Sequence, residues 1–551
     1  MAAEPTARGR WRGAIVVGLA LIAGLGVALA FPPFRLLAGL LGFALLMALV
    51  ERADPRRPLK SAFWRGWVAG VGFFAVSTWW ISEAFQVDAA EQGWMAPFAV
   101  ALIAAGFALF WACGAVLYRL AAARGVLRVL VFAGVFAAVE WLRGNMLTGF
   151  PWDLAGESWP AGSPLSQGAA LVGAYGLSWI TLAAASAAAL LVDERGPLRG
   201  GLACIAAGLA LGGLWLFGQA RLASPPPPDP HAPLVRIVQA NLPEVARYDA
   251  ASYAATVHAL LDLTTRPAQR APDIVVWPER AIPGEFDSYL APGTWTRDAI
   301  TAALKPGQIL ITGGYRSAVA PAGAYAPEGL VYFNSLLAIR NDPGGLQPLA
   351  RYDKYRLVPF GEYMPLARYV RPLHIEEIVH VGDGFSHGPP PRAIELDGAP
   401  PVQPLICYEA LYPGFTRSGA IASGVRPAWI VNVSDDAWFG GTYGPIQHLN
   451  LASYRAIEEG LPMVRATPTG VSAVVDAYGR SPARLRLPQG RAGVIDALLP
   501  PALPPTAFDR WGEGPFALML LGSLIAAVFA SAHAPPAVAW PRKRTARDGH
   551  A

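Results

Sequence analysis

Charged residues are scarce in this chain of 551 residues: only 15% are Asp, Glu, Lys or Arg, while 54% are hydrophobic. This composition is too apolar for an ordinary soluble protein of this length and indicates a membrane protein. The formal net charge is only +5. Because the excess comes largely from arginines clustered in loops and the C-terminal tail, it favours an orientation signal over a nucleic-acid-binding surface.

Cysteine is scarcer still, with three residues in the whole chain and no Cys-x-x-Cys motif. The eight histidines are scattered along the sequence. We therefore expect no metal site and no cofactor. Lysine is also rare, since only four of the 44 basic residues are lysines. No internal repeat is visible.

Long apolar runs are what the chain has in abundance. Seven come before residue 220 and an eighth lies near the C-terminus, and most approach the ~20 residues that cross a bilayer as a helix. We therefore predict a polytopic α-helical membrane domain of about eight transmembrane helices. The first run follows a basic segment, as a cleavable signal peptide would, but it ends in "FPPF" without a small-residue cleavage site, which favours a retained helix. The runs are residues 13–31, 36–50, 63–83, 94–118, 127–142, 164–192, 199–217 and 514–532.

Basic residues mark alternate connections between these runs. Because Lys and Arg concentrate in cytoplasmic loops, the pattern predicts that both termini are cytoplasmic and that the large segment before the eighth helix is extracytoplasmic. The basic residues used are Arg8, Arg10, Arg12, Arg52, Arg56, Arg57, Lys60, Arg119, Arg124, Arg128, Arg195, Arg199, Arg542, Lys543, Arg544 and Arg547.

The organisation that follows has four parts. We predict a membrane domain with seven helices over residues 1–220, a proline-rich linker over 221–233, a globular domain over 234–505, and an eighth helix with a basic tail over 506–551. In the globular domain, β-rich apolar runs alternate with helical stretches, which is typical of an α/β fold with a buried sheet. The expected strands lie in 234–242, 273–279, 308–315, 331–339, 402–409, 428–434 and 470–479, and helices in 250–265 and 445–460.

Cys407 is the only cysteine in the predicted globular domain, because Cys113 and Cys204 fall in apolar runs. A lone cysteine in an exported domain is either buried and inert or a reactive thiol. Cys407 lies where a buried strand gives way to a loop, a usual place for active-site residues in α/β folds. This position favours a nucleophile.

Two other predicted strand ends carry groups that such a thiol needs. A thiol is only a few per cent thiolate near neutral pH, so it requires a base or a cation nearby. Glu279 follows the strand in "DIVVWPE", and Lys354 precedes Glu362 by eight residues in "YDKYRLVPFGEY". In a chain that otherwise uses arginine, Lys354 hints at a compact ammonium beside a developing oxyanion. Taken singly, each residue is equally well explained as a solvated loop carboxylate or half of a surface ion pair.

The motifs "VVWPE", "YDKYRLVPFGEYMP" and "LICYE", in this order, resemble the nitrilase (carbon–nitrogen hydrolase) superfamily. The wider pattern resembles the apolipoprotein N-acyltransferase family, and nearly the whole chain takes part in the likeness. Further matching stretches are "EWLRGNMLTGFPWDLAG", "NVSDDAWFGGTYGPIQH" and "RAIEEGLPMVRATPTGVSAVVDAYGR". The resemblance implies a membrane domain joined to an extracytoplasmic α/β nitrilase-like domain, an αββα sandwich.

The resemblance also implies residue roles. Glu279 would be the general base, Lys354 the oxyanion stabiliser and Cys407 the nucleophile. Four supporting residues and two residues of a substrate loop are implied as well: Glu362, Tyr408, Glu409 and Asn334, and then Tyr248 and Trp438. Trp438 is equally well explained as a core residue.

This sequence departs from the family pattern at three positions. Tyr248 stands near the place of a frequent loop tryptophan, and Asp435 and Pro468 stand where the family usually has asparagine. None of the three belongs to the Glu–Lys–Cys triad.

The resemblance implies an N-acyltransferase of the bacterial cytoplasmic (inner) membrane that acts last in lipoprotein maturation. It would move the sn-1 acyl chain of a phospholipid, phosphatidylethanolamine by family analogy, through a Cys407 thioester. The acceptor would be the α-amino group of the S-diacylglyceryl-cysteine of an apolipoprotein. The expected partners are therefore this lipid, this acceptor and the bilayer, and no nucleic acid.

Two alternatives stay open on the sequence. A membrane-tethered amidase that hydrolyses a small amide would use the same triad, although eight helices exceed what a tether needs. A transporter or scaffold with an inactive nitrilase-like domain would carry ionisable residues along a membrane pathway. The apolar runs hold almost none, which disfavours the second alternative.

Overall fold

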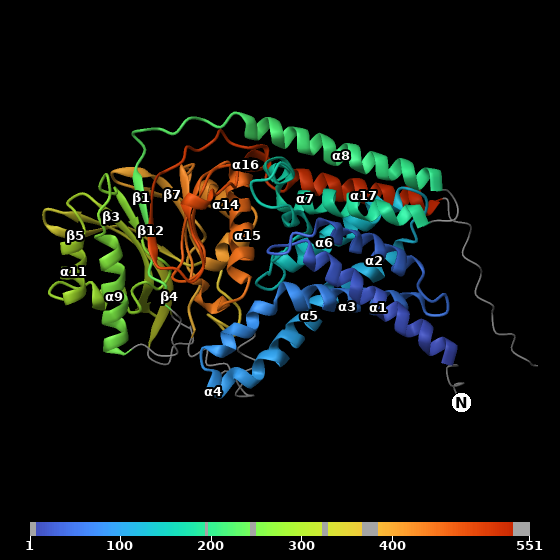
Figure 1. Ribbon diagram of the computed structural model, residues 1–551, viewed down its shortest axis with the longest axis horizontal. Coiled ribbons are helices and arrows are strands. Elements are labelled where there is room, and N and C mark those ends of the chain that lie inside the picture. The colour runs from blue at the N-terminus through green and yellow to red at the C-terminus, as the bar shows by residue number, and fades with distance from the viewer. Residues whose placement is uncertain (1–6, 193–196, 243–248, 322–328, 366–383, 533–551) are drawn as a thin grey trace, which may run out of the picture.

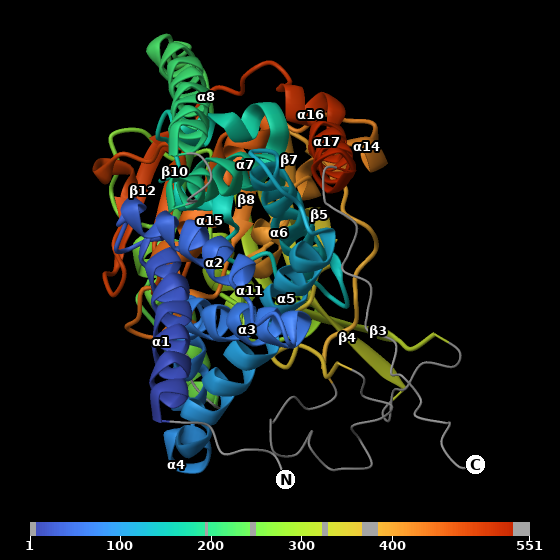
Figure 2. The same ribbon diagram turned by 90° about the vertical axis from the view of Figure 1, so that its right-hand side faces the viewer.

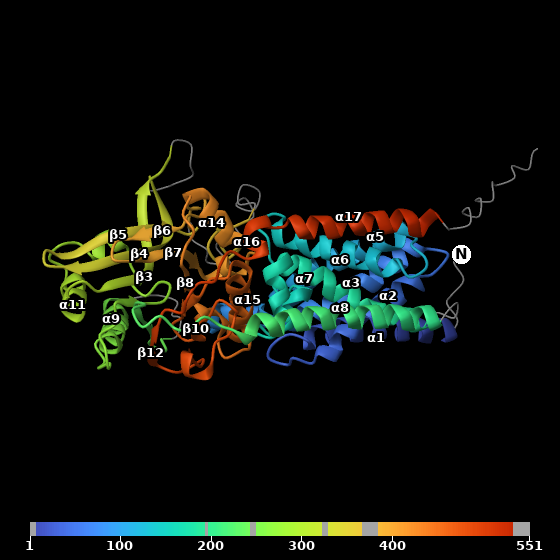
Figure 3. The same ribbon diagram turned by 90° about the horizontal axis from the view of Figure 1, so that it is seen from above.

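The computed structural model describes residues 7–192, 197–242, 249–321, 329–365 and 384–532. A helical bundle and an α/β domain lie end to end (Figure 1). Most of the bundle helices run roughly parallel to one another and away from the α/β domain (Figure 3). Helix α1 begins at the end of the bundle that is far from the α/β domain (Figure 1).

Each of the eight predicted apolar runs lies in a helix or in two or three consecutive helices. The longest uninterrupted helices are rich in Ala, Leu and Val, which have no polar side chain to bury. Viewed from the bundle end, α8 and α17 lie at the periphery (Figure 2). The bundle helices are α1 (Ala7–Leu29), η1 (Leu37–Leu41), α2 (Gly42–Glu51), α3 (Pro58–Ser77), η2 (Trp79–Gln86), α4 (Ala89–Gln92), η3 (Gly93–Met95), α5 (Ala96–Ala121), α6 (Arg128–Asn145), η4 (Ala155–Ser158), η5 (Leu165–Gly168), α7 (Ala169–Ser186), η6 (Ala187–Val192), α8 (Pro197–Ala223) and α17 (Gly514–Ala532).

Length and composition identify fewer spans than eight. Among the described residues, four helices are long and apolar enough to cross a bilayer, or five if the pair Pro58–Ser77 and Trp79–Gln86, bent by 49°, counts as one span. Gly13–Leu29 and Leu37–Glu51 are apolar but shorter. The number of eight therefore stays a prediction.

The α/β domain is built on two six-stranded sheets. In the first, β1, β2 and β3 are parallel neighbours; in the second, β7, β8 and β9 are. The strands of the first sheet, in spatial order, are β12 (Gly493–Leu498), β1 (Leu234–Gln239), β2 (Ile274–Val276), β3 (Ile309–Val319), β4 (Leu330–Asp342) and β5 (Gly345–Asp353). Those of the second are β11 (Arg486–Leu487), β10 (Ser472–Val475), β9 (Met463–Ala466), β8 (Trp429–Val433), β7 (Ala399–Ile406) and β6 (Ile394–Leu396).

The two sheets face each other across an apolar core that takes residues from both, such as Ile237 and Val276 from one and Ile406 and Val431 from the other. Helices cover the outer faces, so the layers follow the order α, β, β, α (Figure 1). The expected α/β fold is confirmed. The covering helices are α9 (Ala250–Thr264), α10 (Phe286–Tyr289), α11 (Trp295–Ala303), α14 (Phe415–Ser423), α15 (Gly444–Glu459) and α16 (Ala507–Trp511).

All seven expected strand segments contain a strand, and both expected helices are present. Five strands escaped the apolar pattern: β5, β6, β9, β11 and β12. The short strands β6 and β11 have two or three residues, and β9 ("MVRA") carries a fully buried arginine, Arg465. A strand that buries a charge breaks the apolar run that predicts it.

Candidate active site

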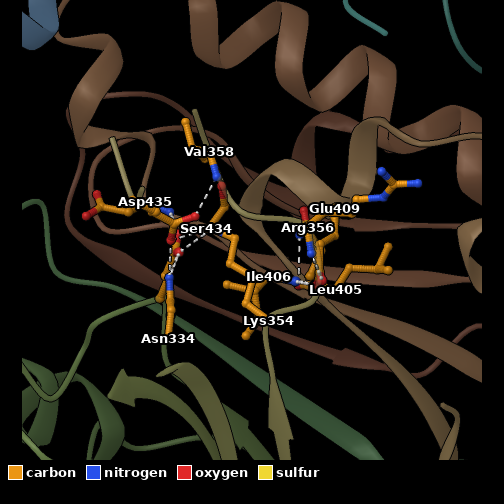
Figure 4. Close-up of polar contacts among 12 residues, drawn as sticks. Asn334, Lys354, Arg356, Val358, Leu405, Ile406, Glu409, Ser434 and Asp435 are labelled. Carbon is orange, nitrogen blue, oxygen red and sulfur yellow. Dashed lines mark hydrogen bonds and ion pairs between the residues drawn. The ribbon is translucent and has the colours of Figure 1, made fainter. Parts of the chain in front are cut away.

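The ends of three strands and the interior of a fourth bring the predicted residues together. Glu279 follows β2, Lys354 directly follows β5, and Cys407 directly follows β7, while Asn334 lies within β4. In the view of Figure 4, Lys354 lies between Asn334, Ser434 and Asp435 on one side and Glu409 and Ile406 on the other.

Glu279 is 5% exposed, and both of its carboxylate oxygens are bound. Oε1 accepts hydrogen bonds from Asn334 Nδ2 at 2.7 Å and from Lys354 Nζ at 3.1 Å, and Oε2 accepts one from the Asp435 backbone N–H at 2.7 Å. The backbone of Glu279 packs tightly on β3, because a Cβ at Gly313 would lie only 2.6 Å from its Cα. These contacts fix the direction of a buried carboxylate.

Lys354 is 1% exposed and bridges two carboxylates. Its Nζ lies 3.1 Å from Glu279 Oε1 and 2.9 Å from Glu362 Oε1, and Asn334 Nδ2 donates to the same two oxygens. Burial would lower the pKa of Lys354, but the two carboxylates outweigh it and raise the pKa above its usual value. The ammonium therefore stays charged. We name Glu279, Asn334, Lys354 and Glu362 the site cluster.

Cys407 stands at the first position of the turn η8 (Cys407–Leu411) and is partly exposed. Its φ is +49°, in the left-handed region that a residue with a Cβ rarely adopts. Burial raises the pKa of the thiol, and the charge of Glu279 raises it further, while Lys354 lowers it. The thiol thus needs both a base and a cation at the moment it reacts.

Glu409 joins the chain around Cys407 to the chain around Lys354. Its Oε1 accepts hydrogen bonds from the Tyr355 N–H and the Tyr352 hydroxyl, both at 2.7 Å, and its Oε2 accepts one from the Ile406 N–H at 2.8 Å. Burial raises the pKa of Glu409 to about 7, although these hydrogen bonds work to lower it. Among the described residues, Glu409 makes no hydrogen bond with Glu279, and its partners here are mainly backbone N–H groups, so it holds backbone segments in place.

Tyr408 connects the turn of Cys407 to the helical bundle. Its hydroxyl donates to the carbonyl of Gly149, in the loop after α6, and the hydroxyl of Tyr412 donates to the carbonyl of Thr148 at 2.7 Å. Arg143 of α6 orders that loop by donating to the carbonyl of Trp152 at 2.8 Å. The bundle therefore contacts the turn that carries the thiol.

Of the two substrate-loop residues, the structure describes only Trp438. Tyr248 lies outside the described residues. Trp438 lies on η9 (Asp436–Phe439) and is 37% exposed, so it is not a core residue. Asp435 contributes its backbone N–H to Glu279, and Pro468 accepts a hydrogen bond from the Asn241 N–H at 2.8 Å.

A second group of buried charges lies where α15 meets the bundle. Arg455 lies 3.2 Å from Glu157 and 2.8 Å from Glu458, and all three side chains are at most 1% exposed. Glu458 also accepts the N–H of Ala174, on α7, at 2.8 Å. We name Glu157, Arg455 and Glu458 the docking cluster. The sequence alone does not reveal it, because Glu157 lies about 300 positions before Arg455 and Glu458 and only the stretches around them matched a pattern.

Among the described residues, no group of three or more His, Cys, Asp or Glu side chains is arranged to hold a metal ion. The site cluster instead offers a carboxylate beside an ammonium, with a thiol close enough for both charges to act on it. This arrangement suits proton removal from the thiol and stabilisation of an oxyanion.

Two family patterns match the chain. The pattern described as "Apolipoprotein N-acyltransferase N-terminal domain" matches residues 23–187, and "Carbon-nitrogen hydrolase" matches residues 234–503. The two matches correspond to the helical bundle and the α/β domain.

Curated relatives match along nearly their whole length. An apolipoprotein N-acyltransferase of Caulobacter vibrioides is 52% identical over 513 residues, which cover 92% of this chain and 94% of the relative. That of Rhodopseudomonas palustris is 36% identical over 520 residues, covering 93% and 94%. Among solved structures, an amidase from Nesterenkonia sp. is 15% identical with a TM-score of 0.32, and the alignment covers 54% of this chain and 99% of the amidase.

Proposed function

The chain belongs to the apolipoprotein N-acyltransferase family, and from this membership we propose how its site transfers an acyl chain. It is an acyltransferase of the inner membrane, with a phospholipid donor and a lipoprotein acceptor. The observation that supports the mechanism best is the ion pair of Lys354 with Glu279 at the strand ends beside Cys407. Phosphatidylethanolamine as the donor and its sn-1 chain are part of the proposal.

In the first step, Glu279 takes the proton of the Cys407 thiol and the thiolate attacks the ester carbonyl carbon. Lys354 stabilises the tetrahedral oxyanion. An ammonium has three donors, and among the described residues two are given to Glu279 and Glu362, which leaves one for the oxyanion. When the intermediate collapses, the lysophospholipid oxygen takes the proton back from Glu279, and a thioester remains on Cys407.

In the second step, the α-amino group of the diacylglyceryl-cysteine attacks the thioester carbon. Glu279 accepts the proton of the amine, the amide forms, and the Cys407 sulfur leaves and recovers a proton. Glu279 thus serves both half-reactions, as expected of a ping-pong mechanism.

Glu362 and Asn334 support the proposed base and cation. Glu362 Oε2 accepts the N–H of Val358 at 2.8 Å, which anchors the carboxylate while its Oε1 binds Lys354. Asn334 also accepts the Lys354 backbone N–H at 2.8 Å through its own carbonyl. These contacts favour a role in fixing the position of both the backbone and the ammonium of Lys354.

The topology belongs to the proposal as well. We infer eight spans, cytoplasmic termini and a periplasmic α/β domain, with residues 1–220, 221–233, 234–505 and 506–551 as the four parts. Both substrates are lipids, and each CH₂ of an acyl chain stabilises the lipid in the bilayer by about 0.8 kcal/mol. Because the substrates therefore stay in the membrane, a site held at the membrane surface is favoured. Alkylation of single cysteines placed in the predicted loops of intact cells would test the orientation.

The test of the mechanism is an intact-mass measurement. Purified protein in detergent is incubated with phosphatidylethanolamine, for wild type and for Cys407→Ala. A hydroxylamine-sensitive gain of one acyl chain on the wild type alone supports the thioester. No adduct on folded, lipid-bound wild type would contradict acyl transfer and favour the hydrolysis of a small amide.

A further inference from the structure

Cys407 has a close neighbour that the proposed mechanism does not use. Strands β7 and β8 are parallel with Ile406 opposite Val433, so Cys407 and Ser434 take equivalent positions just past the ends of adjacent strands. Adjacent strands lie about 4.8 Å apart. Ser434 is fully buried. Its hydroxyl therefore lies beside the thiol, away from solvent.

The Ser434 hydroxyl donates to a buried anion. Ser434 Oγ lies 2.8 Å from Asp436 Oδ1. Arg465 Nη2 lies 2.8 Å from both oxygens of Asp436, and His448 Nδ1 lies 3.1 Å from Oδ1. All four side chains are at most 1% exposed. The Asp436 carboxylate is thus fixed by contacts that are separate from the site cluster.

The room around Asp436 is also fully occupied. A Cβ at Gly470 would lie 2.4 Å from Asp436 Cβ, so the loop after β9 packs directly against it. Burial works to raise the pKa of Asp436, but Arg465 and His448 outweigh it and hold the pKa below its usual range. Asp436 is therefore a permanent anion at a fixed place.

Three charged groups from the surrounding elements act on the Cys407 thiol, and the titratable His448 lies close to one of them, Asp436. Glu279, after β2, and Asp436, on η9, disfavour the thiolate, whereas Lys354, after β5, favours it. His448, on α15, has its pKa lowered by burial and by Arg465 and is neutral at neutral pH. A hydrogen bond with Ser434 favours the thiolate together with Lys354.

We propose that Ser434 is a further catalytic residue, whose hydroxyl turns from Asp436 to the Cys407 sulfur when Glu279 takes the thiol proton, and that Asp436 positions it. A hydroxyl has a single hydrogen, so it serves one acceptor at a time. The S–H bond breaks, an O–H bond forms on Glu279, and Ser434 keeps its own proton and changes only its acceptor. The inference rests on the proposed role of Cys407 as nucleophile.

The test compares Ser434→Thr with Ser434→Val, which have nearly the same shape and differ in the hydroxyl. The rate of Cys407 alkylation by iodoacetamide is measured against pH on the full chain in detergent, by mass spectrometry of the peptide that contains Cys407. Because Cys113 and Cys204 fall in other peptides, they do not interfere. We expect Ser434→Val to raise the midpoint by about one pH unit, since a hydrogen bond to a charged group is worth roughly that much. Ser434→Thr should stay near wild type.

Ser472→Ala is the matched control. Ser472 is equally buried and lies in the same sheet, but its hydroxyl accepts the N–H of Thr467 at 2.9 Å. Its profile should match wild type. If the larger side chains unfold the protein, Ser434→Ala against wild type provides the same comparison.

Equal midpoints for Ser434→Thr and Ser434→Val would overturn the inference, as would an equal shift in Ser472→Ala. Alkylation needs no lipid, so this outcome is independent of the thioester measurement. If the Ser434 variants differ as expected but the wild type forms no thioester, acyl transfer would be contradicted, while stabilisation of the Cys407 thiolate by Ser434 would stand.

Discussion

The site cluster and the docking cluster are built from the same materials but have different surroundings. Each places one buried cation between two carboxylates: Lys354 between Glu279 and Glu362, and Arg455 between Glu157 and Glu458. The site cluster lies at strand ends beside a partly exposed thiol. The docking cluster has no thiol beside it among the described residues and is sealed between α15 and the bundle.

The difference shows that buried ion pairs do not by themselves identify a catalytic site. Arg455 also donates to the carbonyl of Leu411, at the end of the turn that begins with Cys407. Its planar fork is suited to fixed, multiple contacts, whereas the ammonium of Lys354 retains a donor for a reacting atom. The docking cluster therefore suits holding the α/β domain on the bundle, and the site cluster suits chemistry.

The largest expected effect is a loss of activity, which should follow a change in the site cluster and not one in the docking cluster. Glu279→Gln keeps the size of the side chain but cannot accept a proton, so we expect thioester formation to fall about a thousandfold. The melting temperature of the variant should stay close to that of the wild type. Single-turnover acylation followed by intact mass, beside thermal unfolding, measures both. A tenfold loss or less would contradict the role of general base.

Lys354→Arg keeps the charge and tests the shape of the cation. The guanidinium is planar and cannot bring a point charge to the same oxyanion position, so we expect a loss of about a hundredfold in thioester formation. The lipid should still bind. Near-normal activity would show that charge alone suffices and would remove the contrast between Lys354 and Arg455.

The docking cluster should show its effect in stability against pH. Burial raises the pKa of Glu157 from 4.5 to about 8. The positive charge of Arg455 lowers this pKa, whereas the negative charge of Glu458 raises it. The folded state thus holds this proton to higher pH than the unfolded state, so the Glu157 contribution to stability is full below about 4.5 and is lost as pH rises to about 8.

Glu157→Gln should remove that loss. At pH 8.5 we expect the variant to be more stable than wild type by on the order of 2 kcal/mol, and at pH 5 to be nearly equal. Denaturant unfolding at the two pH values measures the difference. Activity per folded molecule should be retained. If Glu157→Gln is less stable than wild type at pH 8.5, the predicted direction of the Glu157 effect on stability is wrong.

Tyr408→Phe has the smallest expected effect and probes the contact between the two regions. It removes the hydrogen bond to the Gly149 carbonyl, at a cost of about 1 kcal/mol, and should slow thioester formation about fivefold by loosening the turn of Cys407. Tyr412→Phe, which lies farther along the same chain, should lose similar stability but keep more activity. Equal activity losses in the two variants would indicate a purely structural contact.

Much of this organisation could be predicted from the sequence. The apolar runs predicted the helices of the bundle, and β-rich runs predicted seven strands, because burial leaves a local pattern in the order of residues. The residues Glu279, Lys354 and Cys407 were named because each follows a predicted strand or belongs to a family motif. Their catalytic roles stay predictions, while their proximity is an observation.

What only the tertiary structure decided is which distant residues meet. Glu279 binds the backbone of Asp435, 156 positions away, and Tyr408 reaches Gly149 across 259 positions. The sequence determined which segments bury their side chains, because hydrophobic periodicity is local. Strand order and register determined that Ser434 stands beside Cys407 and that Arg455 lies between Glu157 and Glu458, because these contacts depend on packing between elements and leave no periodic mark along the chain.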